Sequence, residues 1–592
     1  MRAAGEVTAA DRIASLLVEN FDASYRLFRE ISAGAKARFE AADWPAVQSA
    51  SRERIRLEDD QVERTVEQLR VELGPACRDE SAWSAAKRRY IVLLVDHKRP
   101  ELAETFFNSV STRVLGRSYV RNEFMFVRAT TSTEYIPADP PTYRSYDAHD
   151  DLHATFAAVM HNAGWSRPFA DLDRDVGRLV CAVAAKLQVP EPQLQVSVLG
   201  SAFYRNKAAY VVGKIVNGND ELPFAIAVVH DEEGRLTIDT VLLDSSAIDV
   251  LFSLSRAYFM VDMDVPSGYV EFLRTIMPTK PRSEIYSSVG LQKQGKTLFF
   301  RDLLHHLDHS EDLFVEAPGA RGQVMHVFTL PSYPYVFKVI RDRFGPAKNT
   351  TREAVMRKFQ IVKEVDRVGR MVDALEFVDL ALPIARFAPA LLDQLDELAP
   401  SAIEVDGASL VVKHCYVERR MRPLDIHLKT ASERELDRVV CEYGDTLREL
   451  AIANIFPGDL LWRNFGLTRH GRVVCYDYDE LEYLTDCVFR EIPAAPSPEA
   501  ELSDEVWYAV GSNDVFPEEF ETFLLGREAI RRAFLRHHPE LLHAAFWQES
   551  QRRVAAGEIV DFFPYPEDVR FSTRFRRPPA AAGIRPAGGR AG

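Results

Sequence analysis

The stretch Asn454–Glu480 reads NIFPGDLLWRNFGLTRHGRVVCYDYDE and holds two carboxylates and an amide at a defined spacing. Four residues separate Asp459 from Asn464, and the apolar run 473–476 then ends in Asp477. An aspartate and an asparagine on one loop, with a second aspartate at the end of the next strand, can orient a hydroxyl and hold a divalent cation against phosphates. Phosphoryl transfer depends mainly on positioning and charge stabilisation, so these three side chains suit it.

The same spacing occurs in the protein-kinase pattern H-R-D-x-x-x-x-N followed by D-F-G. By that pattern Asp459 is the expected catalytic residue, which accepts the proton of the substrate hydroxyl, and Asn464 and Asp477 are the expected metal ligands. Two departures stand out, because Phe456–Gly458 replaces His-Arg and Tyr478–Asp479 replaces Phe-Gly. The alternative is an ordinary polar loop between a helix and a strand, since Asp, Asn and Gly are common turn residues.

The region before this loop has the order of a kinase N-lobe. A glycine-bearing loop is followed by a strand, a proline-rich turn and a second strand in which Lys338 alternates with apolar neighbours. Backbone N–H groups near Gly319 and Gly322 could approach phosphates, and Lys338 would pair with the α- and β-phosphate oxygens. The candidate nucleotide-binding residues of this loop are Ala317, Pro318, Gly319, Ala320, Arg321, Gly322 and Gln323.

A helix predicted to begin near Thr350 should supply the carboxylate partner of Lys338. Glu353 and Glu364 are the two candidates, and the sequence does not choose between them. The strand-like run 410–417 and the link after it suit a hinge where adenine would bond to backbone groups.

The quoted stretch, together with DEVWYAVGSNDVFPEEF at 504–520, resembles the bacterial isocitrate dehydrogenase kinase/phosphatase family. The resemblance runs from about Phe21 to Arg574. It implies a bifunctional enzyme that phosphorylates and inactivates isocitrate dehydrogenase on a serine with ATP, and that also removes this phosphate. Flux between the citric acid cycle and the glyoxylate bypass would be controlled in this way.

The resemblance also implies the ligands: ATP and ADP with Mg²⁺, or Mn²⁺ in its place, at one site for both activities, and AMP as an effector of the N-terminal half. It links Asp373, in GRMVDALEF, to phosphatase action, although Asp373 could equally cap a helix or lie in a turn. Asp479 is a further candidate catalytic carboxylate because it lies outside the ordinary kinase pattern.

The composition fits a globular protein with large cores. Of the 592 residues, 46% are hydrophobic, and the net charge of -15 argues against a nucleic-acid or anionic-membrane partner. The six cysteines are scattered, as expected of reduced thiols. No apolar run reaches membrane-span length and no secretory signal is visible, so we expect a cytoplasmic protein.

The expected fold class is α+β. Apolar residues at helical spacing fill the region from Ala9 to Val114, and short β-branched runs separated by turns between Leu194 and Leu243 predict an antiparallel meander. We expect a mixed regulatory domain at 1–312, an atypical bilobal protein-kinase-like domain at 313–573 and a disordered tail at 574–592.

The segment 507–520 combines aromatic and acidic residues, and we expect it to be an exposed protein-contact loop. Two other functions remain open on sequence alone. One is a small-molecule phosphotransferase of the aminoglycoside or choline kinase type, and the other is a nucleotide-sensing pseudokinase.

Overall fold

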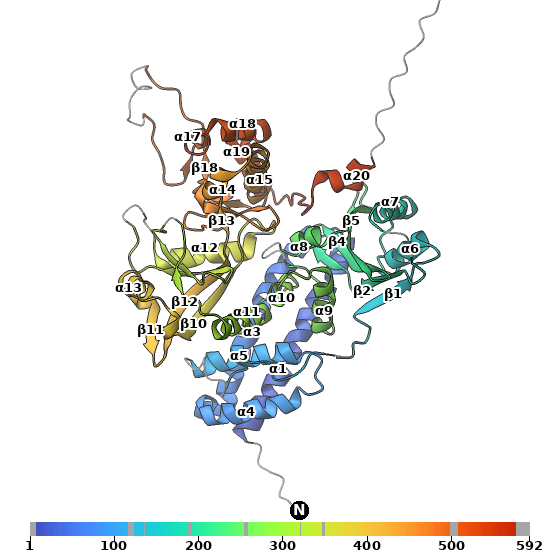
Figure 1. The fold of residues 1–592 in the computed structure, drawn as a ribbon, viewed down its shortest axis with the longest axis vertical. Coiled ribbons are helices and arrows are strands. Elements are labelled where there is room, and N and C mark those ends of the chain that lie inside the picture. Colours follow the sequence, from blue (N-terminus) through green and yellow to red (C-terminus); the bar gives the residue numbers. More distant parts are fainter. Residues whose placement is uncertain are drawn as a thin grey trace, which may run out of the picture.

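The protein is described by a computed structural model with two bodies joined through a central group of helices (Figure 1). The structure describes residues 8–575 except 117–123, 135, 188–190, 254–257, 320, 346–347, 349 and 498–506. Mixed helices and antiparallel sheets in both halves confirm the predicted α+β class. Among the described helices, none combines the length and apolar character needed to cross a membrane.

The chain begins with a bundle of long helices, as the helical spacing predicts. Thr8 caps the first helix in a reciprocal capping box with Asp11, which satisfies backbone donors that the first turn leaves unpaired. Ile13, Leu17 and Trp83 are fully buried in the bundle core. The elements are α1 (Ala9–Ala33), α2 (Ala35–Glu40), α3 (Trp44–Leu73), η1 (Gly74–Arg78), α4 (Glu80–Leu93) and α5 (Pro100–Leu115).

An antiparallel sheet in the order β1-β2-β4-β5-β6, with β3 beside β4, confirms the predicted meander. Tyr210 and Val212 face the helical bundle, whereas Val211 between them faces α6 and α7, so both faces of the sheet are buried. The elements are β1 (Tyr143–Asp147), α6 (Leu152–Asn162), α7 (Leu172–Ala184), β2 (Gln195–Leu199), β3 (Phe203–Arg205), β4 (Ala208–Asn217), β5 (Asp220–His230) and β6 (Leu236–Leu242).

Four helices connect the two halves: α8 (Ser245–Leu251), α9 (Pro266–Ile276), α10 (Arg282–Ser288) and α11 (Gln292–His309). The last of these packs against the second sheet, because Phe299, Leu303 and Leu307 share a core with Phe337 and Phe377. The expected domain boundary at residue 312 falls between α11 and the first strand of that sheet.

The second sheet has the order β10-β12-β9-β8-β7, with β11 beside β12, and all its pairs are antiparallel. Helix α12 covers one face, where the rings of Phe359 and Tyr416 stack with centroids 3.6 Å apart. Helices α11 and α13 cover the other face. The elements are β7 (Val315–Glu316), β8 (Met325–Thr329), β9 (Tyr335–Ile340), α12 (Arg352–Val365), β10 (Ala374–Pro383), η2 (Ile384–Arg386), α13 (Pro389–Leu398), η3 (Pro400–Ala402), β11 (Ile403–Asp406) and β12 (Ser409–Arg419).

A mostly helical lobe follows, coloured orange to red in Figure 1. Its central helix α15 starts after the cap Ser432 and buries Leu436, Tyr443 and Leu447. The elements are β13 (Arg422–Pro423), α14 (Leu424–Thr430), α15 (Glu433–Ile452), β14 (Ile455–Phe456), η4 (Trp462–Asn464), β15 (Phe465–Leu467), β16 (Val473–Cys475), β17 (Glu482–Tyr483), η5 (Leu484–Asp486), β18 (Val488–Phe489), β19 (Asp514–Val515), α17 (Glu519–Leu524), α18 (Glu528–His537), η6 (Pro539–Leu542) and α19 (Ala544–Ala555).

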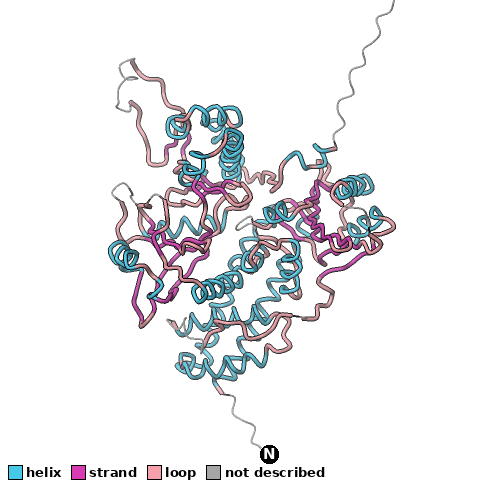
Figure 2. Tube along the Cα trace, in the orientation of Figure 1, coloured by secondary structure: helices cyan, strands magenta, loops and turns pink. Residues whose placement is uncertain are grey.

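The chain then returns to the first half through a loop that Figure 2 shows between the two bodies. This loop leads into η7 (Glu567–Val569) and α20 (Phe571–Arg574). The Tyr565 hydroxyl donates to Asp239 Oδ2 at 2.7 Å, and Phe571 is buried in the core beneath α6 and α7. The expected disordered tail starts at Arg574, which here ends α20. Residues 576–592 lie outside the described residues.

Candidate active site

Lys338 lies on β9 and forms a buried ion pair with Glu418 on β12. Lys338 is opposite Tyr416 in the register, so Glu418, two residues further on, projects from the same face of the sheet. Lys338 Nζ lies 2.8 Å from Glu418 Oε2 and donates to the backbone oxygen of Tyr476 at 2.7 Å. The Glu418 side chain is 1% exposed. Burial raises the pKa of Glu418, the ion pair with Lys338 opposes this, and the charge of Asp477 adds to the rise.

The prediction that α12 supplies the partner of Lys338 is therefore wrong. Glu353 is exposed in the first turn of α12. Glu364 Oε1 accepts a hydrogen bond from Arg56 Nη2 at 2.9 Å, which ties it to α3 instead. The acid that reaches Lys338 comes from the neighbouring strand because strand pairing, not helix position, places a carboxylate on the face of the sheet that carries Lys338.

The loop that carries Asp459 depends on Gly458. Gly458 has φ +77°, and a Cβ atom at this position would lie 2.1 Å from the backbone oxygen of Glu480. Only glycine allows this close approach of the loop to the segment after Asp477. Asp459 Oδ1 accepts the Leu461 backbone N–H at 2.9 Å, which fixes the carboxylate at the start of the following turn.

Asn464 and Asp477 are brought together by the backbone. The Tyr476 N–H donates to the Asn464 backbone oxygen at 3.1 Å, and the Asn464 amide nitrogen donates to the Asp459 backbone oxygen at 3.3 Å. The amide oxygen of Asn464 is therefore the atom that could face a cation. An amide oxygen and a carboxylate are ligands that Mg²⁺ accepts, so the donor set fits the predicted metal.

Asp479 and Asp373 are two further carboxylates, one beside Asp477 and the other near the ion pair of Lys338 and Glu418. The Asp479 N–H donates to Asp477 Oδ1 at 3.3 Å. Burial and the charge of Asp477 raise the pKa of Asp479, while Lys348 and Lys338 oppose the rise. Asp373 follows a segment that runs beside β16, because the Val372 N–H donates to the Cys475 backbone oxygen at 2.9 Å. Its charge acts on Glu418, so it lies near the ion pair of Lys338.

The turn before Asp373 is held by Asp366. Its carboxylate accepts the backbone N–H groups of Val368, Gly369, Arg370 and Met371, at distances from 2.7 to 3.4 Å. Even so, burial raises the pKa of Asp366 to about 6. Four bonds to one buried carboxylate fix the path of the chain into Asp373.

The predicted nucleotide loop joins β7 to β8. The Ala317 N–H donates to the Val327 backbone oxygen at 2.9 Å, and Arg321 pairs with Glu316 at 2.8 Å. A Cβ atom on Gly322 would lie 2.8 Å from the Met325 backbone oxygen, so the tight turn needs glycine there. Pro318, Gly319 and Gln323 lie on the same loop, and Ala320 lies outside the described residues. Lys338 is opposite Val327, so the loop leads into the strand beside the lysine.

Asp459 lines a groove of about 650 Å³, and Asp373 is not among the residues that line it. The groove is also lined by residues 512–516 and by Phe523, whose relative exposure is 66%. The expectation that 507–520 forms an exposed protein-contact loop is wrong for Phe516. Phe516 is buried, with the guanidinium of Arg490 5.4 Å from its ring centre, and β19 pairs with β18. The segment is thus anchored in the lobe while it forms one wall of the groove.

Comparison with known proteins places this arrangement in one family. The family model for the regulatory domain of isocitrate dehydrogenase kinase/phosphatase (AceK) matches residues 14–311, and the model for its kinase domain matches residues 312–567. The chain belongs to the isocitrate dehydrogenase kinase/phosphatase family. It is 56% identical to the isocitrate dehydrogenase kinase/phosphatase of Azoarcus sp. (strain BH72) over 582 residues, 98% of this chain and 99% of the relative. It is 55% identical to that of Dechloromonas aromatica (strain RCB) over 576 residues, 96% and 97% of the two chains.

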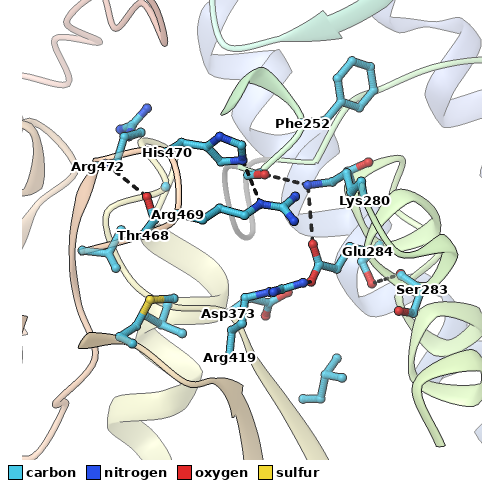
Figure 3. A pocket seen from close by; sticks show the side chains of 18 of the residues that line it. Phe252, Lys280, Ser283, Glu284, Asp373, Arg419, Thr468, Arg469, His470 and Arg472 are labelled. Carbon is cyan, nitrogen blue, oxygen red and sulfur yellow. Dashed lines mark hydrogen bonds and ion pairs between the residues drawn. The ribbon is translucent and has the colours of Figure 1, made fainter. Parts of the chain in front are cut away.

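Between the two halves of this family member lies a cavity of about 250 Å³ (Figure 3). Lys280 and Glu284 line it from the regulatory side, and Asp373, Arg419 and Arg469 line it from the kinase side. Arg419 Nε donates to Glu284 Oε1 at 2.9 Å across the junction. This cavity was not predicted from the sequence. Its one sign in the sequence is the basic pair Arg469 and His470 between two strands.

Asp249 completes the junction beside the cavity. It accepts from Lys280 Nζ at 2.9 Å and from Arg469, and His470 Nε2 lies 3.1 Å from its Oδ2. Burial acts to raise the pKa of Asp249, but the hydrogen bond with His470 and the charge of Lys280 hold it well below the usual value. The loop after Asn464 is thus tied to α8 and α9–α10 by charged groups.

Proposed function

We propose that this chain phosphorylates a serine of isocitrate dehydrogenase with ATP, which inactivates it, and removes that phosphate at the same magnesium–nucleotide site. The observation that carries the proposal is the convergence of Lys338, Asn464, Asp477 and Asp479 within one family-specific fold. These residues have the order of the phosphate-handling groups of a kinase, and Lys338 and Asp479 both contact the segment that carries Asp477.

Each residue has a stated role in this proposal. Lys338, oriented by Glu418, binds the α- and β-phosphate oxygens, and the loop 317–323 covers the phosphates with backbone N–H groups. Asp459 accepts the proton of the serine hydroxyl in the groove that it lines. Asn464 and Asp477 would hold Mg²⁺, or Mn²⁺ in its place, which supplies positive charge to the transferred phosphoryl group.

The reverse direction needs a water molecule in place of the serine hydroxyl. Asp373 and Asp479 lie outside the ordinary kinase pattern, so we assign them to orienting that water. We also propose AMP as an effector that binds the 250 Å³ cavity between the two halves. A cytoplasmic location, and domains at 1–312 and 313–573, complete the proposal. Family membership supports this enzyme over the small-molecule phosphotransferase and the pseudokinase.

The test uses the full chain, isocitrate dehydrogenase and labelled ATP with magnesium. The expected result is label on the dehydrogenase, and release of that label when ADP is present. Asp477→Ala should lose both directions, because its carboxylate serves the phosphate whichever way the group moves. Label on a small alcohol, or no transfer by the wild-type chain, would refute the proposal.

A further inference from the structure

Three side chains of the mostly helical lobe bring sulfur, oxygen and nitrogen atoms together outside the kinase site. Cys441 and Asp445 are four residues apart on α15, so both project from the same face of that helix. His538 directly follows α18, which packs against α15 (Figure 1). One ligand atom from each of the three side chains lies within 4.8 Å of the other two. None of these residues lines the cavity of Figure 3 or the groove beside Asp459.

Gly444 makes room for the His538 ring against α15. A Cβ atom at position 444 would lie 2.1 Å from His538 Cδ2, so any other residue would displace the ring. Glycine weakens a helix interior, and here it stands where the ring needs the space. The His538 backbone is also fixed, because its N–H donates to the Phe534 oxygen at 2.8 Å and Pro539 follows it. The position of the ring is therefore set by the packing of the two helices.

The contacts of His538 leave one ring nitrogen unsatisfied. The side chain is 2% exposed, and Nε2 lies 2.9 Å from the Cys441 backbone oxygen and 3.8 Å from Asp445 Oδ1. Among the described residues, Nδ1 has no hydrogen-bond partner, although Glu540 Oε1 lies 3.7 Å away. A neutral ring that donates from Nε2 to the carbonyl oxygen directs the Nδ1 lone pair toward a carboxylate. Buried polar atoms without a partner are rare, so this one calls for an explanation.

A metal ion bound to Nε2 would resolve this arrangement. The ring proton would then be on Nδ1 and could be donated to Glu540, as metal-binding histidines usually donate from their second nitrogen to a carboxylate or carbonyl. Asp445 is available as a ligand, because in the described part of the chain it forms no ion pair with lysine or arginine. The nearby acid Glu442 is instead paired with Arg370 at 2.5 Å. The Asp445 side chain is 41% exposed, which leaves a path for an ion to enter.

We propose that Cys441, Asp445 and His538 bind one zinc-class divalent cation, which links α15 to the end of α18 and stabilises this lobe. A thiolate, an imidazole and a carboxylate suit Zn²⁺, whereas Mg²⁺ prefers oxygen ligands. Ligand atoms of a tetrahedral zinc lie about 3.3–3.6 Å apart. Cys441 Sγ is 3.9 Å from Asp445 Oδ2, so small side-chain rotations would complete the site. Binding releases the thiol proton of Cys441 to solvent, and a fourth position remains for water.

The binding test uses the full chain, treated with a chelator and kept reduced with a phosphine. Excess Mg²⁺ fills the proposed oxygen-ligand site of Asn464 and Asp477. Co²⁺ is the probe, because a bond from a thiolate to Co²⁺ gives an absorption band that oxygen ligands do not give. We expect one equivalent of Co²⁺ to bind with this band, and Zn²⁺ to abolish the band by displacement.

The variants separate the proposed ligands from other residues. Cys441→Ser should lose the thiolate band, and His538→Gln should weaken Co²⁺ binding about tenfold or more. Glu540→Ala should also weaken it about tenfold, because the ring would lose the group that orients it. Cys181→Ser, at an exposed cysteine of α7, is the matched control and should bind as wild type does.

Thermal unfolding tests the stabilising role. Zn²⁺ at saturation should raise the melting temperature of the wild type by about 2 °C or more and leave that of Cys441→Ser unchanged. Cys441 is only partly buried, so its serine variant keeps the test decisive even if His538→Gln fails to fold.

A wild-type chain without the thiolate band, or a band of equal strength in Cys441→Ser, would overturn the site. The band without any change in melting temperature would overturn the stabilising role. Neither measurement depends on phosphate transfer, so the site and the proposed function can fail independently.

Discussion

The pair of Lys338 and Glu418 allows the structural role of the nucleotide-binding lysine to be separated from its catalytic role. Lys338→Met removes the cation and leaves the Glu418 carboxylate, 1% exposed, without the partner that lies 2.8 Å away. Removing one member of a buried ion pair costs about 3–5 kcal/mol because the remaining charge is uncompensated. The variant should therefore lose both stability and transfer activity.

The double variant Lys338→Met/Glu418→Gln removes both charges. We expect it to regain most of the lost free energy of unfolding but none of the transfer activity, because the cation for the phosphates is still absent. Hydrogen exchange of β9 and β12 measures local stability, and transfer to isocitrate dehydrogenase measures activity. Glu353→Gln is the matched control, since that exposed acid should change neither quantity. If Lys338→Met were as stable as wild type, the ion pair with Glu418 would not stabilise the fold. If the double variant transferred phosphate, Lys338 would not belong to the active site.

Three further outcomes test the loop and the groove. Asp459→Ala should lower the kinase rate about 10²-fold or more, as expected for a positioned acid–base group, and a change of less than about tenfold would make Asp459 a structural residue. Gly458→Ala should destabilise the protein by more than about 1 kcal/mol in thermal unfolding, because a side chain here requires φ +77° and meets the Glu480 backbone oxygen; a wild-type melting profile would contradict this. Phe523→Ser should raise KM for isocitrate dehydrogenase about fivefold or more and leave KM for ATP unchanged, since the ring is exposed beside Asp459; equal effects on both would indicate a folding defect.

The sequence was sufficient for the order of the site residues but not for their partners. Asp459, Asn464 and Asp477 lie within one short stretch, so local spacing predicts their proximity, and the backbone bonds around Tyr476 confirm that proximity. The partner of Lys338 is different. Strands β9 and β12 are far apart in sequence, and their pairing depends on the register of the whole sheet, which no local pattern reveals.

Long-range packing also explains the other misses. No local pattern in the sequence gives a reason for the chain after α19 to return to the first sheet, where Tyr565 binds Asp239. The composition of 507–520 predicts a protein-contact loop, and residues 512–516 of it line the groove beside Asp459. It cannot show that Phe516 is buried, because burial there depends on Arg490 and on the pairing of β18 with β19.

If both activities share one site, Asp477, Asp479 and Asp373 should have different effects on the kinase and phosphatase rates. Asp477 should serve both directions, so Asp477→Ala should depress kinase and phosphatase rates together. Asp479 contacts Asp477 through its own N–H, and Asp373 lies near Glu418, but neither is needed by the ordinary kinase pattern. Asp479→Ala and Asp373→Ala should then lower the phosphatase rate by about 10²-fold or more, with a much smaller loss of kinase rate, because a water molecule needs orientation that the serine of a docked protein does not.

Both rates are measured for each variant on the same substrate protein, with and without ADP. Asp393→Ala, at an exposed position of α13, is the control for loss of a surface carboxylate. If Asp477→Ala kept its full phosphatase rate, or if dephosphorylation by the wild-type chain proceeded without nucleotide, the two activities would use different sites. A kinase loss as large as the phosphatase loss in Asp479→Ala would instead place that carboxylate with Asp477 in the metal site, and Asp373 alone would remain to orient the water.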